Sequence, residues 1–103
     1  MSTIRARNVN HPKHRENLKS EKYHIIREAM LTALTTSSWM PFNELEDKVR
    51  DHLQKQAAPK SLFPKPGSVR WYCKAVQLDL EARGEIERQP KKSPLRLRKC
   101  AEG

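Results

Sequence analysis

Apolar residues recur at spacings of three and four in three separate stretches of the chain, which is the pattern of an amphipathic helix. The pattern predicts helices over residues 20–37, from about residues 41–43 to residue 53, and over residues 68–83. The inward faces consist of Tyr23, Ile26, Met30, Ala33 and Leu34 in the first helix, Phe42, Leu45, Val49 and Leu53 in the second, and Val69, Tyr72, Cys73, Val76 and Leu80 in the third. Because each face can be buried against the others, the sequence predicts a small helical core.

Polar residues and a glycine mark the ends of these helices. Ser20 and Ser68 stand at the starts of the first and third helices, where a serine side chain can accept a hydrogen bond from a free amide. Asn43 with Glu46 resembles a capping box at the second helix. Gly84 follows the third helix, where glycine commonly ends a helix in the left-handed conformation.

The C-terminal residues change from the helical period to alternation. Residues 85–88 and 94–98 alternate between apolar and polar side chains, which predicts two strands. Pro90 and Pro94 bound the loop between them, which suits a hairpin at the edge of a sheet. The inward positions are Ile86, Leu95 and Leu97.

The two ends of the chain show no period. Residues 1–19 are polar and basic, and they predict an arm that is ordered only where Val9 or Leu18 contacts the domain. Residues 100–103 predict a frayed tail. The sequence therefore predicts one small domain over residues 20–99.

A helix that ends at a glycine and leads into a basic hairpin is the layout of a winged helix-turn-helix module. The predicted fold class is thus α+β and mostly helical: a three-helix winged helix-turn-helix with a C-terminal β-hairpin wing and a basic N-terminal arm. The usual partner of this layout is nucleic acid, although a fold alone does not fix a function.

Five short stretches carry a closer resemblance. They are NHP at 10–12, a Lys-Tyr pair at 22–23, LFP at 62–64, WYCKAVQLDLEARG at 71–84 and PLR at 94–96. On these residues the chain resembles a small, functionally uncharacterised bacterial family of winged-helix-like proteins. The resemblance implies the fold and, by analogy with other winged helices, a third helix in the DNA major groove and a wing on the backbone or minor groove. Those roles fall on Arg70, Lys74 and Gln77 in the helix and on Lys91 and Lys92 in the wing; the resemblance supplies no catalytic residue.

Charge is distributed unevenly along the chain. The 103 residues include 21 Lys and Arg against 12 Asp and Glu, which gives a formal net charge of +9. Residues 1–22, 59–83 and 84–103 are each net positive, whereas residues 23–58 carry four basic and five acidic side chains. A basic footprint that is confined to particular elements favours a polyanionic partner.

Further basic residues extend the predicted contact surface. Arg96 and Arg98 join the two lysines of the wing, and Arg5 and Arg7 of the arm can follow a groove. Other interpretations remain open: a basic edge can simply discourage strand pairing, and the arm can be disordered. Arg70 can equally be an ordinary solvated helix residue, as can Lys74.

The third helix carries a second apolar stripe beside its core face. It consists of Trp71, Ala75, Leu78 and Ala82. Such a stripe needs a cover, because exposed aromatic patches often mark interfaces. The cover can be the arm, folded back through Val9 and Leu18, or a second copy of the chain, in which case Trp71 and Leu78 form a candidate homodimer interface.

Cysteine and histidine patterns predict neither a catalytic nor a metal site. Cys73 lies in the apolar stripe of the third helix and Cys100 in the polar tail, so both are expected as reduced thiols. His11 and His14 are near each other in sequence, but no cysteine pair has zinc-ligand spacing. With only three glycines the chain has no glycine-rich phosphate loop. We therefore expect no enzyme, no metal and no cofactor.

Segments that would direct the chain to or across a membrane are also not found. No apolar run approaches the roughly 20 residues that a membrane-spanning helix requires. The first 19 residues lack the hydrophobic centre of a secretory signal, so we expect a cytoplasmic protein without a membrane partner. A basic domain of this size has little room for a small-molecule substrate.

These observations predict a nucleic-acid-binding winged helix, with double-stranded DNA as the expected partner and transcriptional regulation as one role. The alternative is a winged helix that binds proteins and not DNA. Three features favour it: the acidic face of the second helix, Glu81 on the third helix, and the Trp71 stripe. The acidic residues are Glu44, Glu46, Asp47 and Asp51. RNA is a third candidate, but the chain lacks the aromatic strands of a sheet-based RNA platform.

Overall fold

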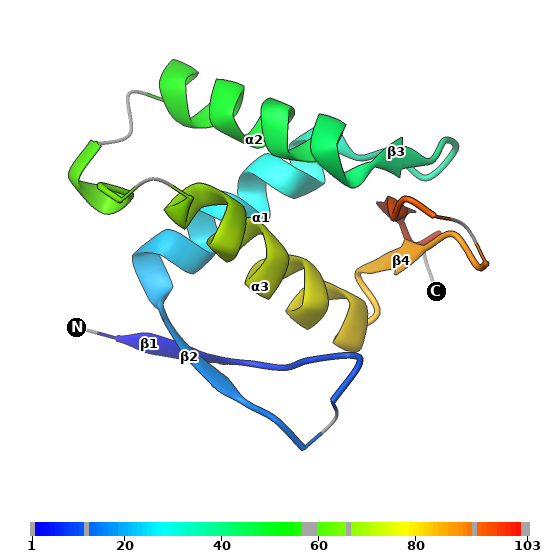
Figure 1. The fold of residues 1–103 in the computed structure, drawn as a ribbon, viewed down its shortest axis with the longest axis horizontal. Coiled ribbons are helices and arrows are strands. Elements are labelled where there is room, and N and C mark those ends of the chain that lie inside the picture. Colours follow the sequence, from blue (N-terminus) through cyan, green and yellow to red (C-terminus); the bar gives the residue numbers. More distant parts are fainter. Residues whose placement is uncertain (1, 12, 57–59, 66, 92, 102–103) are drawn as a thin grey trace.

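The structure, a computed structural model, describes residues 2–11, 13–56, 60–65, 67–91 and 93–101. In chain order it contains β1 (Thr3–Ala6), β2 (Glu16–Lys19), α1 (Ser20–Ala33), β3 (Met40–Pro41), α2 (Phe42–Lys55), a 3-10 turn (Lys60–Leu62), α3 (Ser68–Ala82), β4 (Ile86–Arg88) and β5 (Arg96–Lys99). Within these ranges three helices are accompanied by two small antiparallel sheets, β1-β2 and β3-β5-β4 (Figure 1). The predicted α+β class, with three helices, is confirmed.

The three helices pack against one another because each presents an apolar face to a common centre. Buried positions are Tyr23, Ile26, Met30 and Leu34 from α1 and its end, Phe42, Leu45, Val49 and Leu53 from α2, and Val69, Cys73, Val76 and Leu80 from α3. The predicted faces are therefore confirmed, except that Ala33 and Tyr72 are only partly buried. The first helix is shorter than predicted, because Leu34 adopts extended backbone with ψ 152°.

The predicted serine caps do not form. The residue before α1 is Lys19, the end of β2, and Ser20 Oγ instead contacts Ser2 Oγ at 2.5 Å. Gly67 takes the position before α3 with a left-handed φ of +83°, so Ser68 lies inside the helix. Glycine accepts this conformation without the steric cost that a side chain would bring.

The C-terminal strands form a sheet with a third strand that the sequence did not predict. β4 and β5 pair antiparallel, with Ile86 opposite Lys99, as expected for the hairpin. β3 pairs on the other edge of β5, with Met40 opposite Leu97. A strand of two residues is too short for alternation to be seen in a sequence. Gly84 has the left-handed φ of +77° that its position after α3 predicted.

Much of residues 1–19, predicted as an arm without regular structure, forms a hairpin. β1 and β2 pair antiparallel, with Ala6 opposite Glu16. Leu18 is fully buried and Ala6 is 2% exposed, so both strands belong to the core, whereas Val9 is 39% exposed in the loop. Neither strand shows a clear alternation in the sequence, because each is four residues long and β2 is mostly polar.

The segment between α2 and α3 is attached to the core by an aromatic contact. The Phe63 ring meets the Tyr72 ring edge-on, with centroids 5.4 Å apart. Lys22 Nζ lies 5.5 Å from the centroid of Phe63, within the range of a cation–π contact.

Among the residues that the structure describes, no helix is long and apolar enough to cross a membrane.

Candidate nucleic-acid interface

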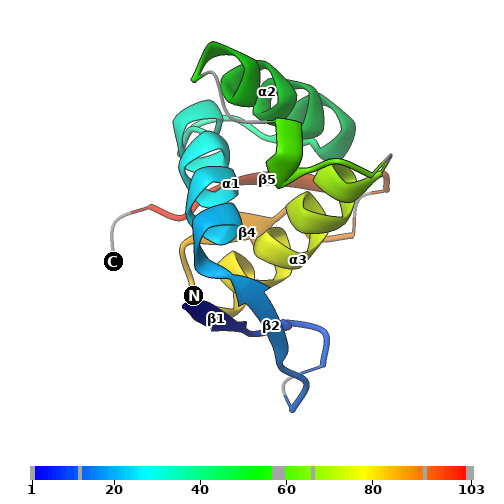
Figure 2. The same cartoon turned by 90° about the vertical axis from the view of Figure 1, so that its left-hand side faces the viewer.

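The outward face of α3 lies between two hairpins. We call residues 3–19 the N-terminal hairpin and residues 86–99 the C-terminal hairpin. In Figure 2 the loops of both hairpins lie on the α3 side of the molecule, away from α1. In Figure 1 the N-terminal hairpin lies below α3, and the C-terminal hairpin lies beyond the end of the helix. A large ligand that approaches α3 from outside therefore also meets the hairpins.

Arg70 lies in the first turn of α3 and is tied to α2. Its Nη1 donates to Glu46 Oε1 at 2.6 Å and approaches Asn43 Oδ1 at 3.4 Å. Partial burial opposes ionisation of Glu46, but hydrogen bonds from Arg50 and Arg70 outweigh it and lower the pKa of this carboxyl. Arg70 remains exposed, with its guanidinium 5.3 Å from the centroid of the Phe42 ring. Its charge is thus partly compensated.

Two predictions about the start of α2 are wrong for the same reason. Asn43 and Glu46 do not form a capping box, since α2 has no side-chain cap. The Glu46 side chain is 12% exposed, so it does not belong to the solvated acidic face on which the sequence placed it. Both side chains are turned toward α3 by Arg70.

Lys74 lies one turn beyond Arg70 and is exposed. Its Nζ lies 5.1 Å from the centroid of the Phe42 ring. Partial burial, followed by repulsion from Arg88 and then from Arg70, lowers the pKa of Lys74. Its side chain lines one hollow together with Pro94 of the C-terminal hairpin and another beside the N-terminal hairpin. Lys74 is therefore the basic residue of α3 that adjoins both hairpins.

The prediction that Gln77 reads a base is wrong. Its side chain is fully buried, and its Nε2 donates to the carboxylate of Glu81. That carboxylate also accepts from Arg88 Nε at 2.6 Å, and the hydrogen bond raises the pKa of Arg88. The three residues hold α3 to β4. The charge of Glu81, which favoured protein binding over DNA binding in the sequence, is compensated by Arg88.

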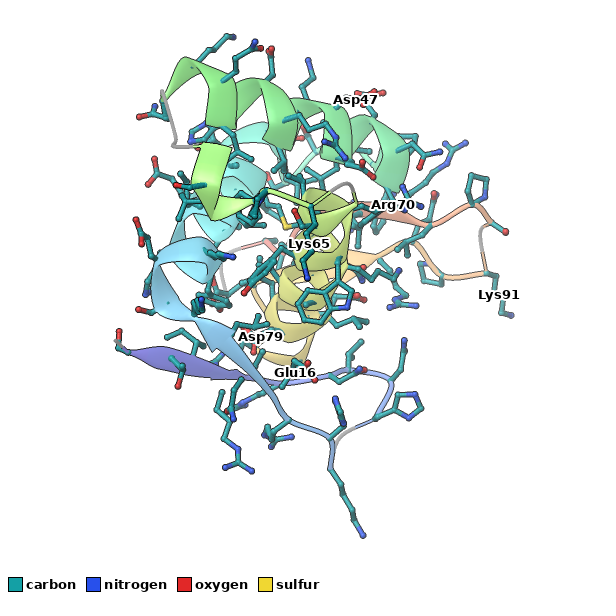
Figure 3. The ribbon with its side chains drawn as sticks, turned by 60° about the vertical axis from the view of Figure 1, so that its left-hand side comes forward. Glu16, Asp47, Lys65, Arg70, Asp79 and Lys91 are labelled. Atoms are coloured by element: carbon teal, nitrogen blue, oxygen red, sulfur yellow. The ribbon has the colours of Figure 1, made fainter. Side chains whose placement is uncertain are left out.

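The basic residues predicted at the tip and edge of the C-terminal hairpin occupy different environments. Lys91 is exposed at the tip (Figure 3). Arg96 is exposed on β5. Lys92 lies outside the described residues. Arg98 is partly buried: its Nε donates to Glu87 Oε2 at 2.6 Å, and its guanidinium lies 4.1 Å from the centroid of the Trp39 ring. Arg98 thus holds the sheet together.

Arg5 and Arg7 of the N-terminal hairpin are both exposed. The backbone N–H of Arg7 donates to Asp79 Oδ1 at 2.7 Å, so the main chain and not the guanidinium fixes the hairpin to α3. The loop that follows is shaped by Asn8, whose Oδ1 accepts from the backbone amides of Asn10 at 2.9 Å and His11 at 3.2 Å. This local bonding is typical of asparagine in turns.

Asp79 is the residue that sequence reasoning missed. It is fully buried, and its carboxylate accepts from the Tyr23 hydroxyl at 2.5 Å and from Arg83 Nε at 2.8 Å, in addition to the Arg7 amide. Burial, and then the hydrogen bond to Asp79, raise the pKa of Tyr23. The available signal was an acid next to the core position Leu80, because a buried carboxylate requires several donors.

The second apolar stripe of α3 borders a cavity of about 230 Å³ between α3 and the N-terminal hairpin. Its walls include Ala6, Arg7, His14 and Glu16 from the hairpin, and Trp71, Lys74 and Leu78 from α3. Leu78 is partly buried, whereas Trp71 is 50% exposed. The hairpin therefore covers part of the stripe, as the intramolecular interpretation predicted, although Val9 is not the residue that covers it.

Cys73 is a buried free thiol, as its position in the apolar stripe of the third helix predicted. It is fully buried, and burial, together with the charge of Glu46, raises the pKa of its thiol to about 12. Burial also raises the pKa of Cys100, and both cysteines are free. Among the described residues, no three His, Cys, Asp or Glu side chains are grouped so that they could hold a metal ion.

Comparison with known protein families shows that most of the chain matches one family. Residues 3–97 match a family of unknown function, DUF6958, and the chain belongs to that family. The match begins in β1, so the N-terminal hairpin is part of the family domain. Comparisons with curated proteins and with solved structures give no match.

Proposed function

We propose that this member of a family without an assigned activity is a winged-helix protein that binds double-stranded DNA. The outward face of α3 would meet the duplex, and the two hairpins would contact it on either side. One observation carries the proposal: Arg70 and Lys74 are exposed on α3, between two hairpins whose loops lie on the same side of the molecule. A formal net charge of +9 supports a polyanionic partner. A module of this kind can serve in transcriptional regulation.

The order of the elements supports the winged-helix part of the proposal. After α1 the chain runs through β3, α2, α3, β4 and β5, so the third helix leads directly into a hairpin. The C-terminal hairpin has the position of the wing in that layout. Because β3 pairs with β5, this hairpin is joined to the start of α2 and projects from a fixed base.

The environment of each basic residue narrows the proposed contact set. Lys74 and Arg70 would lie nearest the duplex, with Lys91 and Arg96 contacting it from the wing. Arg5 and Arg7 would contact phosphates from the N-terminal hairpin. Gln77 and Arg98 leave the set as direct contacts, because the first is buried and the second is held by Glu87 and Trp39.

The test is fluorescence anisotropy with a random-sequence duplex, at about 50 mM and about 200 mM salt, where phosphate contacts have a large effect. We expect binding that weakens steeply with salt. Each neutralised phosphate contributes about −0.9 to the slope of log K against log salt, so R70A/K74A should reduce the slope by roughly 2. Because Arg70 and Lys74 are exposed, this variant should fold.

The matched control is K48A/K55A, which removes the same charge from exposed positions of α2. If net charge alone drives binding, both double variants will weaken it equally. If α3 is the interface, only R70A/K74A will weaken duplex binding. Absence of duplex binding at the lower salt contradicts the proposed function outright.

A second candidate function is protein association without DNA binding. It is favoured by the half-exposed Trp71 and by the partial compensation of Arg70 by Glu46. Under this proposal Trp71 and Leu78 form a homodimer interface. Size-exclusion chromatography with light scattering would then give a concentration-dependent dimer that W71A abolishes. A monomer over the whole accessible concentration range would rule it out.

A further inference from the structure

The cavity beside Trp71 combines an aromatic surface with polar and basic walls. Trp71 is the most exposed large aromatic residue that the structure describes, although its ring meets the Tyr72 ring edge-on at a centroid distance of 5.2 Å. An edge-on contact leaves much of the indole accessible, in agreement with the exposed fraction of 50%. Leu78 extends the apolar floor of the cavity.

Charge at this cavity is predominantly positive. Arg7 of the N-terminal hairpin and Lys74 of α3 both line the cavity, so each of the two walls includes a basic residue. His14 and Glu16 provide hydrogen-bonding groups, and His14 Nε2 lies 3.2 Å from Glu16 Oε2. Glu16 is the carboxylate within the cavity wall, and its neighbours are basic or neutral. The arrangement can hold a flat aromatic group that is attached to phosphates.

We propose that this cavity binds an unpaired nucleotide, whose base stacks on Trp71 while Arg7 and Lys74 contact the phosphates that flank it. Stacking of bases on aromatic side chains next to basic residues is the usual way in which proteins hold single strands. The inference deepens the proposed function and rests on it: the preferred target would be a duplex with an unpaired end or a distorted site, not a uniform duplex.

The size and the polarity of the cavity favour a nucleotide over the homodimer interface. A volume of about 230 Å³ lies below the roughly 300–1,000 Å³ of pockets that hold drug-sized ligands, and it suits a single planar ring system. A second copy of the chain would carry the same positive charge as the cavity walls. It would also have to bring an apolar group into a cavity whose hairpin wall includes the polar residues Arg7, His14 and Glu16.

The experiment uses tryptophan fluorescence, because the chain has two tryptophans and only Trp71 borders the cavity. In W39F, Trp71 is the only tryptophan. Three oligonucleotides are titrated at about 50 mM salt: a single strand of thymidines, a blunt duplex, and the same duplex with a thymidine overhang. We expect the strand and the overhang duplex to quench Trp71 emission, and the blunt duplex to bind without quenching.

Anisotropy on the otherwise unchanged chain provides the second readout. W71A should weaken binding of the overhang duplex about tenfold, the loss expected for one stacked base, and leave the blunt duplex unaffected. W71F retains an aromatic ring and should recover most of the affinity. The control variant is L31A, a partly buried apolar residue of α1 that lies outside the cavity wall. Circular dichroism confirms that each variant is folded.

Each outcome has a distinct meaning. Equal binding of overhang and blunt duplexes, with no quenching and no effect of W71A, would overturn the nucleotide site and leave the DNA-binding proposal standing. No binding of any oligonucleotide would overturn both. A change in Trp71 emission on concentrating the protein alone, together with dimer formation, would assign the stripe to a second copy of the chain and not to a nucleotide.

Discussion

The two hairpins that border α3 are attached to it by different means. The N-terminal hairpin is held through its main chain, because the backbone amide of Arg7 donates to the buried carboxylate of Asp79. The C-terminal hairpin is held through an arginine side chain, since Arg88 of β4 forms a salt bridge with Glu81 of α3 at 2.6 Å. A second arginine, Arg98, pairs with Glu87 within the hairpin, also at 2.6 Å. The N-terminal hairpin thus leaves Arg5 and Arg7 exposed, whereas Arg88 and Arg98 of the C-terminal hairpin serve the fold.

This difference bears on where an anionic partner would bind. The sequence places basic residues in both hairpins and does not rank the two as contact surfaces. In the structure, salt bridges occupy Arg88 and Arg98 of the C-terminal hairpin, so these two cations are less available to a partner. Arg5, Arg7 and Lys13 of the N-terminal hairpin are exposed. We therefore expect the N-terminal hairpin to contribute at least as much to binding as the C-terminal hairpin.

The largest predicted effect concerns Asp79, the attachment of the N-terminal hairpin. D79N keeps the shape of the side chain but removes the charge that accepts from Tyr23, Arg83 and the Arg7 amide. Removing one partner of a buried charged cluster commonly costs about 3 kcal/mol. Urea denaturation should show a loss of this size, and hydrogen exchange should become faster in β1 and β2.

The control for Asp79 is Asp47, an exposed acid on the outer side of α2 (Figure 3). D47N makes the same chemical change where no such cluster exists, so stability should change by less than about 0.5 kcal/mol. If D79N and D47N are equally stable, the main-chain attachment does not hold the hairpin, and the contrast between the two hairpins fails.

A smaller effect separates Arg98 from Arg96, its near neighbour on β5. R98A removes the Glu87 salt bridge and the Trp39 contact, which are partly exposed, so the free energy of unfolding should fall by about 1 kcal/mol. R96A should leave stability unchanged and weaken duplex binding, because this side chain is exposed. Denaturation and anisotropy on both variants test the distinction. Equal effects on stability would show that Arg98 is not structural.

The sequence was sufficient where one regular pattern ran through a whole element. The periods of Phe42 to Leu53 and of Val69 to Leu80 predicted the buried faces of α2 and α3, and Gly84 predicted the end of α3. These features are local, since the spacing along one helix determines which side is apolar.

The sequence was insufficient where distant segments determine the outcome. β1 and β2 are short, and β3 has two residues, so their pairing depends on surfaces that only the folded chain presents. Gln77 lies in a polar stripe by sequence but is buried, because β4 brings Arg88 to Glu81 and the resulting group covers it. The same limit applies to Arg70, whose partner Glu46 belongs to another helix.

The smallest predicted effect concerns the carboxylate of Glu46 in α2, which forms a salt bridge with Arg70 of α3. Hydrogen bonds from Arg50 and Arg70 outweigh partial burial and lower the pKa of Glu46 from its ordinary 4.5. A carboxyl whose pKa is lower in the folded state stabilises the fold above the ordinary pKa, and this contribution is lost as the pH falls through the folded-state value. E46Q has no ionisable group at this position. The difference in stability between the unchanged chain and E46Q should therefore be largest at neutral pH and shrink on acidification below 4.5.

Urea denaturation across that pH range measures the difference in the free energy of unfolding. The control is E44Q, which makes the same change at the exposed Glu44 of the same helix. A difference that does not depend on pH would mean that Glu46 acts by packing alone, and Arg70 would then be as available to a partner as the exposed Arg5 and Arg7.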